Sequence, residues 1–326
     1  MAISLLLLLV ATLVIYLCCE SFTNSVEWLG QRLRLGHTAT GTILAALGTA
    51  LPEGVVTLVA TGFSKLPSQQ AIGIGAALGG PLALSTLAYA CVGVCLLRLG
   101  RAPRLAAAER SRLTRDQGVF LAIFAVKIGL GVVAFSGKPW CGLGFLAAYG
   151  LYLLSELRQP ADHGATPALE PLKLRPHATD PALGWILTQC LGAAILTFAA
   201  SRLFVVQLDA LAPWLGIEPQ LAALVIVPIA TELPETLNAI IWVRQGKDGL
   251  ALANISGSMM IQATVPTSFG LFFTPWLLDR ALLLAGAATA LAILYLIPLF
   301  RAKVIRPVAL AQVAWILPML LAALLV

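Results

Sequence analysis

The hexapeptide GTALPE occupies residues 48–53, and a near copy, ATELPE, occupies residues 230–235. Each lies inside a long apolar segment in its own half of the chain, and Thr, Leu, Pro and Glu recur at matching positions. Proline has no N–H and frees the backbone carbonyl four residues earlier, and broken membrane helices occur where they line a cavity. Pro52 and Pro234 therefore predict one helix break in each half, beside a glutamate.

The composition around these motifs is that of a polytopic membrane protein. Of the 326 residues, 59% are hydrophobic and 11% are charged, and the mean hydropathy is +0.92, whereas soluble domains carry about 25% charged residues. The apolar residues form segments comparable with a membrane span of about 20 residues. Ten such segments lie at roughly 2–19, 38–63, 70–98, 117–136, 139–155, 182–204, 214–243, 249–276, 280–300 and 305–325. The sequence predicts an all-α protein with ten transmembrane helices.

The basic residues set the expected orientation. Lys and Arg concentrate in alternate short loops, above all in residues 98–115, and such loops stay cytoplasmic. This predicts a cell-membrane protein with both termini outside and the polar linker 157–181 in the cytoplasm. The linker separates a first five-helix half, residues 1–156, from a second, residues 182–326. Because five crossings reverse the direction of entry, we expect two inverted five-helix repeats, as in many secondary transporters.

The repeated motif carries side chains that suit a hard cation. Glu53 and Glu235 supply carboxylates, and Thr49 and Thr231 supply hydroxyl groups; Ca²⁺ takes six to eight oxygen ligands. The alternative is that the prolines only kink the helices and the glutamates are protonated or capped. A charge at the bilayer centre costs at least about 2.5–3.5 kcal/mol, so two glutamates at matching positions favour a cation site.

These motifs resemble those of the calcium:cation antiporters, a family that includes the sodium/calcium exchangers. The resemblance covers nearly the whole chain and implies two five-helix halves. It implies that Glu53 and Glu235 bind Ca²⁺ at the centre and that Thr49 and Thr231 help to form the Ca²⁺ site and flanking Na⁺ sites.

A second family motif is similar to residues 253–262, ANISGSMMIQ. The resemblance places further cation-site residues at Asn254, Ser258 and Gln262. In the first half the equivalent stretch, GAALGGPLAL at residues 75–84, offers Gly80 and Leu84 where the family has side-chain oxygens. Half of the outer ligand shell is therefore expected to be missing.

Two further charged residues lie inside apolar segments, and the first of them departs from the family pattern. Glu232 stands at the matching serine position, three residues from Glu235, where two like charges raise a pKa unless a cation lies between them. This suggests a divalent-cation site that exchanges protons; the alternative is that Glu232 faces the membrane surface. Lys127 lies near the centre of its segment and is a candidate charge partner or counter-ion substitute, or it extends toward an interface.

The resulting hypothesis is an antiporter that exchanges Ca²⁺, or a similar divalent cation, for Na⁺ or H⁺ by alternating access, with no cofactor. One alternative is a cation channel or a non-transporting cation sensor on the same scaffold. A second is an intramembrane enzyme, against which the spans show no nucleophile beside a recognisable base. The expected partners are inorganic cations and the lipid bilayer. The basic residues lie in loops rather than among aromatic residues, so neither a nucleic acid nor an obligate protein partner is inferred.

Overall fold

The computed structural model describes residues 1–32, 45–157 and 169–325, and every regular element in them is helical. The first half contains α1 (Ala2–Arg32), α2 (Ala45–Gly62), α3 (Pro67–Ala83), the π-helical turn η2 (Leu84–Ala88), α4 (Tyr89–Arg98), α5 (Ala107–Val132), η3 (Lys138–Trp140) and α6 (Cys141–Leu157). The second half contains α7 (Leu183–Leu211), η4 (Ala212–Leu215), α8 (Pro219–Thr231), α9 (Leu233–Arg244), α10 (Asp248–Phe273), α11 (Arg280–Arg301), α12 (Pro307–Gln312), η5 (Val313–Trp315) and α13 (Ile316–Leu325).

Each of the ten predicted segments consists mainly of helix where the structure describes it, but this does not fix the number of membrane spans. By length and apolarity, five helical units of the described chain qualify as spans, or six if the bent pair α8–α9 counts as one. The predicted segment 70–98 is α3, η2 and α4 in succession. The helix predicted from residue 117 begins instead at Ala107, because a charged, helix-forming stretch extends it beyond the apolar run.

The distribution of side chains is inverted relative to that of a soluble protein. Large apolar residues such as Leu13 of α1 and Ile195 of α7 are exposed on the outside, whereas Glu53, Gln117 and Gln262 are buried inside. Apolar side chains face lipid at no cost, and polar groups in the membrane turn inward to find partners. The chain is an integral, multi-pass membrane protein.

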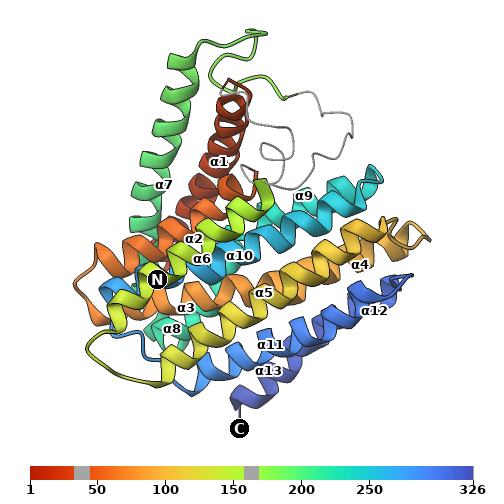
Figure 1. Ribbon diagram of the computed structural model, residues 1–326. Coiled ribbons are helices and arrows are strands. Elements are labelled where there is room, and N and C mark those ends of the chain that lie inside the picture. Colours follow the sequence, from red (N-terminus) through yellow and green to blue (C-terminus); the bar gives the residue numbers. More distant parts are fainter. Residues whose placement is uncertain (33–44, 158–168, 326) are drawn as a thin grey trace.

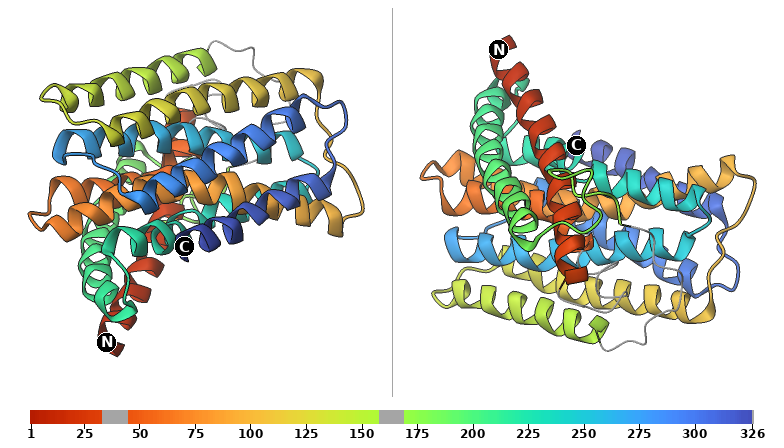
Figure 2. Two further views of the ribbon diagram at one scale, coloured as in Figure 1. Left: turned by 90° about the horizontal axis from the view of Figure 1, so that it is seen from below. Right: turned by 90° about the horizontal axis from the view of Figure 1, so that it is seen from above.

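Helices α1 and α7 lie side by side and run in opposite directions, inclined across the other helices (Figures 1 and 2). Next to them, α2 and α3 pack against each other, and each contacts both α8 and α10. Two further contacts each join a helix of the first half to a helix of the second half: α6 packs on α10, and α4 packs on α12. Segments from both halves therefore meet at α2, α3, α8 and α10.

Glycines bring two of these central helices together. A Cβ on Gly75 or Gly79 of α3 would collide with the backbone carbonyl of Gln220 or Leu224 on α8. Small residues let helix backbones approach closely in membranes. The close contact between α3 and α8 thus requires glycine at these positions.

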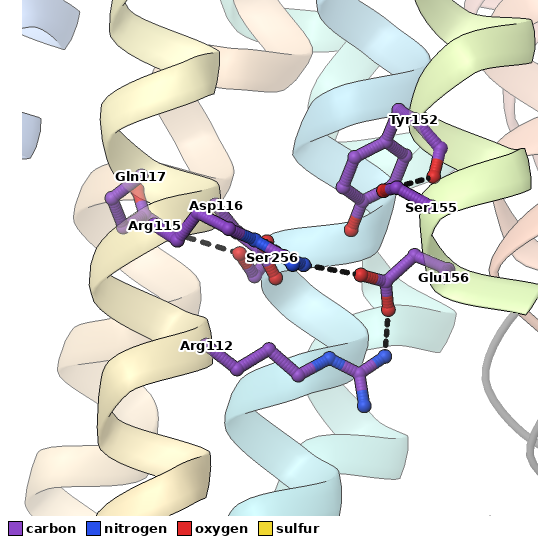
Figure 3. A network of polar contacts seen from close by, with 8 residues as sticks. All are labelled: Arg112, Arg115, Asp116, Gln117, Tyr152, Ser155, Glu156 and Ser256. Carbon is purple, nitrogen blue, oxygen red and sulfur yellow. Dashed lines mark hydrogen bonds and ion pairs between the residues drawn. The ribbon is translucent and has the colours of Figure 1, made fainter. Parts of the chain in front are cut away.

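The arginine-rich end of the molecule is held by ion pairs (Figure 3). Arg112 and Arg115 of α5 both pair with the buried carboxylate of Glu156 on α6. Two residues after Arg115 on α5, Gln117 donates from Nε2 to Ser256 Oγ of α10 at 3.1 Å. These contacts join α5 to α6 and to α10, whose middle part carries the candidate site.

A second ion pair fixes the start of α10. Arg101, in the loop before α5, donates to both carboxylate oxygens of Asp248, at 2.5 and 2.9 Å, and Arg104 N donates to Oδ2 at 2.8 Å. The Asp248 carboxylate raises the pKa of the Arg101 guanidinium above its usual value. The first turn of α10 is therefore anchored to the first half of the chain.

The predicted linker 157–181 is described only in part, because residues 158–168 lie outside the described chain. The remainder packs against α1: Trp28 Nε1 donates to the carbonyl of Glu170 at 2.9 Å, and Leu172 is fully buried. This portion of the linker therefore packs on α1 and does not extend away from the helices.

Candidate cation-binding site

Glu53 is fully buried on α2. The helix runs without interruption from Ala45 to Gly62 with Pro52 inside it, so the break predicted at Pro52 is not observed. A proline inside a helix removes one hydrogen bond, and the remaining bonds on either side keep the backbone helical. The side chain of Thr49, another predicted ligand, lies outside the described residues.

The second half does contain a break, at Glu232. Helix α8 ends at Thr231, α9 begins at Leu233, and the two helices are bent by 43°. Pro234 lies in the first turn of α9, where its missing N–H would have no helical partner in any case. The break thus precedes the proline by two residues and places Glu232 at the bend.

Glu232 turns toward Glu53. The two carboxyl groups interact directly. Thr231 Oγ1 lies 3.2 Å from Glu53 Oε2 and 2.9 Å from Glu232 Oε1, and Gln262 Nε2 of α10 donates to Glu232 Oε2 at 2.7 Å. Glu232 is buried, so the alternative that it faces the membrane surface is wrong. The structure brings Glu53, Thr231, Glu232 and Gln262 together.

Gly80 of α3 provides the space for this cluster. A Cβ at Gly80 would lie within 2.7 Å of both carboxylate oxygens of Glu53 and of Gln262 Oε1. The position that appeared from the sequence to lack a ligand is therefore filled by oxygens from α2 and α10. This role of Gly80 was not predicted from the sequence, because the oxygens that approach it come from other helices, α2 and α10.

Several buried oxygens of the described residues have no hydrogen-bond partner. They include Glu53 Oε1, Gln262 Oε1, Ser258 Oγ and, with its amide nitrogen, Asn254 Oδ1. Leaving a buried polar atom unpaired costs about 1–3 kcal/mol. Carboxylate, amide and hydroxyl oxygens are ligands for hard cations such as Ca²⁺, so these residues fit a cation cargo. No three His, Cys, Asp or Glu side chains converge within the described chain, and a cation here would also draw on amide and hydroxyl oxygens.

Glu235 is fully buried in the first turn of α9. Both Glu235 and Glu232 interact electrostatically with Cys19 of α1. Glu232, at the bend, also interacts with Glu53, a partner from the other half of the chain that helical spacing did not indicate. That Glu53 and Glu235 share one ion stays a prediction.

Lys127 of α5 reaches the same region. Its Nζ donates to the backbone carbonyls of Ala77 on α3, at 2.6 Å, and Gln262 on α10, at 3.4 Å, and it interacts electrostatically with Glu53. Lys127 is fully buried, so the alternative that it extends to an interface is wrong. The sequence identified this lysine but not its two carbonyl partners.

Comparison with known proteins decides the family. The family model described as "Sodium/calcium exchanger protein" matches residues 3–157 and 185–326. The chain belongs to the sodium/calcium exchanger family. Curated relatives include the inner membrane protein YrbG of Escherichia coli (strain K12), 25% identical over 278 residues covering 84% of this chain and 81% of YrbG. Another is the putative antiporter CaxA of Alkalimonas amylolytica, 24% identical over 286 residues covering 86% of this chain and 84% of CaxA.

Solved structures of exchangers share the fold of this member of the sodium/calcium exchanger family. The crystal structure of the H⁺/Ca²⁺ exchanger CAX has a TM-score of 0.75 at 17% identity, covering 99% of this chain and 82% of CAX. A structure of the sodium-calcium exchanger NCX_Mj has a TM-score of 0.63 at 18% identity, covering 98% of each chain. The exchanger family transports cations and is not a family of enzymes, so the protein is a cation antiporter and the enzyme alternative is excluded.

Proposed function

We propose that this antiporter exchanges Ca²⁺, or a similar divalent cation, for protons. The observation that carries the proposal is the contact between the Glu53 and Glu232 carboxyl groups, which come from opposite halves of the chain. Two carboxyl groups in contact hold a proton between them when no metal is present, since like charges at that distance do not both ionise in a low dielectric. A divalent cation supplies the same neutralisation and displaces the proton.

The proposed ligands come from three helical regions. Glu53, Thr231, Glu232 and Gln262 bind the divalent cation directly, because their oxygens converge beside Gly80. The other predicted ligands complete the shell or bind a second ion; they are Thr49, Glu235, Asn254 and Ser258.

Coupling in this scheme arises from competition for one set of oxygens. Either Ca²⁺ or protons occupy the carboxylates, and the loaded site opens to one side of the membrane at a time. We further propose that residues 1–156 and 182–326 are inverted five-helix repeats. The support is the antiparallel contact of α1 and α7, together with the contacts of α6 with α10 and of α4 with α12.

The proposed topology has ten spans, with both termini outside the cell membrane and the linker 157–181 in the cytoplasm. The support is the concentration of arginines in residues 98–115, together with the tendency of basic loops to stay cytoplasmic. Cysteine labelling from each side of sealed cells, with a Cys placed at exposed His177 and another at exposed Trp214, tests it.

The test of function is ⁴⁵Ca²⁺ uptake into proteoliposomes under an imposed pH gradient or an imposed Na⁺ gradient. We expect uptake under the pH gradient, abolished by a protonophore, and none above background under the Na⁺ gradient alone. Uptake driven only by Na⁺ would overturn proton coupling but keep Ca²⁺ antiport. Ca²⁺ currents that do not saturate and occur without counter-transport would support the channel alternative. Ca²⁺ binding without flux would support the sensor alternative.

A further inference from the structure

Two backbone carbonyls near the candidate site are freed by prolines. Pro81 lies inside α3 and Pro266 inside α10. Because proline has no N–H, the carbonyl four residues earlier loses its helical partner. The carbonyls affected are those of Ala77 and Gln262, and both are in the buried interior.

The ammonium group of Lys127 donates to both carbonyls in place of the missing backbone N–H groups. Its Nζ donates to Ala77 O at 2.6 Å and to Gln262 O at 3.4 Å. These are the two carbonyls that the prolines free. In discontinuous transporter helices, carbonyls freed in this way coordinate Na⁺. Lys127 thus places a positive charge where such carbonyls would otherwise attract a free cation.

The surroundings hold this ammonium group in place. Nζ lies 5.5 Å from the ring centroid of Phe124 and 5.9 Å from that of Trp276, distances at which an aromatic face attracts a cation. Trp276 Nε1 donates to the backbone carbonyl of Lys127 at 3.2 Å. The tryptophan is fully buried and has φ of +48°, a backbone conformation that few non-glycine residues adopt.

The negative partner of Lys127 is Glu53, with which it interacts electrostatically. Glu53 is therefore next to two positive or proton-bearing groups, Lys127 and the carboxyl of Glu232. We propose that the Lys127 ammonium is a tethered cation that occupies a monovalent-ion position beside Glu53 and excludes Na⁺ from it. This role rests on the proposed antiport function, and it makes Lys127 a determinant of ion specificity rather than a ligand of Ca²⁺.

Substitution by methionine tests the inference. Lys127→Met keeps an unbranched side chain but leaves the two freed carbonyls without a cation. We expect Na⁺, but not choline, to raise the thermal stability of the purified variant, because a ligand that binds the folded state stabilises it. We also expect a Na⁺ gradient to drive ⁴⁵Ca²⁺ uptake by the variant about fivefold or more above the wild type.

Lys138 provides a matched control. It is another buried lysine, and its Nζ also donates to two backbone carbonyls, Val133 O at 2.7 Å and Trp276 O at 2.9 Å. Its contacts lie at the turn before α6 rather than at the freed carbonyls. We expect Lys138→Met to remain insensitive to Na⁺, and Lys127→Arg, which keeps the charge, to remain insensitive as well.

The outcomes separate this inference from the proposed function. Specific stabilisation of the wild type by Na⁺ would overturn the tethered-cation role even if Lys127→Met failed to fold, and so would a folded Lys127→Met protein that ignores Na⁺. Both measurements are made without a flux assay. Absence of proton-driven ⁴⁵Ca²⁺ uptake by the wild type would instead overturn the proposed function.

Discussion

Glu53 of α2 and Glu232 at the bend between α8 and α9 come from opposite halves of the chain, and their carboxyl groups interact in the interior. Thr231 Oγ1 lies within hydrogen-bonding distance of both carboxyl groups, and Gln262 donates to Glu232. A cation that binds here contacts both halves at once. Binding of the cation therefore changes the Glu53–Glu232 interaction, which joins the two halves.

Neutralising either acid is expected to abolish Ca²⁺ exchange. Glu53→Gln and Glu232→Gln keep the side-chain volume but remove a charge, and loss of a charged hydrogen-bonding group costs about 1.5–3 kcal/mol, or at least about tenfold in Ca²⁺ affinity. ⁴⁵Ca²⁺ flux in proteoliposomes measures the effect. Glu218→Gln, at an exposed glutamate before α8, is the control with unchanged flux. Full exchange by Glu53→Gln would contradict the assignment.

Apparent Ca²⁺ affinity is expected to fall as pH falls. The carboxylates must lose their shared proton before they bind a metal, and metal binding to such ligands is coupled to proton release. For one displaced proton, the half-saturating Ca²⁺ concentration rises by up to about tenfold per pH unit in the acidic range. Ca²⁺ dependence of uptake at a series of equal internal and external pH values checks this. An affinity independent of pH would contradict proton competition.

Replacing the hydroxyl between the two acids is expected to weaken Ca²⁺ binding. Thr231→Val preserves the shape but removes the oxygen that approaches both carboxyl groups, and one hydrogen bond contributes about 0.5–1.5 kcal/mol. Isothermal titration with Ca²⁺ measures the change. Thr197→Val is matched, because the buried Thr197 hydroxyl donates to the carbonyl of Ala193 in its own helix and contacts Cys18 of α1, neither of which is a proposed ligand. Equal effects of the two variants would argue against a ligand role.

A methyl group at position 80 is expected to stop transport. In Gly80→Ala the new Cβ would meet the carboxylate of Glu53 and the amide oxygen of Gln262, so the oxygens must move out of their arrangement. Gly54→Ala is the control, because a Cβ there meets no atom within 4 Å. Flux and thermal stability are measured together. Transport by Gly80→Ala at the wild-type rate would show that the oxygens do not need this space.

The Arg101–Asp248 pair is expected to contribute to stability rather than to ion selectivity. Asp248→Asn weakens a bidentate ion pair with a buried carboxylate and is expected to lower the free energy of unfolding by roughly 1–3 kcal/mol. Asp180→Asn, in an exposed pair with Arg32, is expected to change it by less than about 1 kcal/mol. Thermal unfolding in detergent compares the variants. A shift in the ratio of proton-driven to Na⁺-driven uptake would contradict a purely structural role.

The sequence predicted the helical class and the family correctly, because apolar segments and the duplicated hexapeptide depend only on local residue order. Proline effects were predicted less well. The interruption in the second half occurs at Glu232 rather than at Pro234, and α2 continues through Pro52. Whether a proline ends a helix depends on the packing around it, and a single sequence does not contain that information.

Contacts between site residues that are far apart in the sequence were harder to predict. Helical spacing placed Glu232 near Glu235 but gave no sign that Glu232 also interacts with Glu53. The proline rule applied to Pro52 and Pro234 also identifies Ala77 and Gln262 when it is applied to Pro81 and Pro266. That signal was present in the sequence. Its partner, Lys127, was found only through the packing of α5 against α10.

The bend between α8 and α9 has a mechanical consequence. Glu232 is the residue at which α8 and α9 meet at a bend of 43°, so it lies at the pivot between the two helices. A small rotation of α9 about that pivot swings the far end of the helix through a large arc while the carboxylate moves little. Under the proposed function, the far end of α9 can therefore move while the carboxylate that binds the cation stays nearly in place.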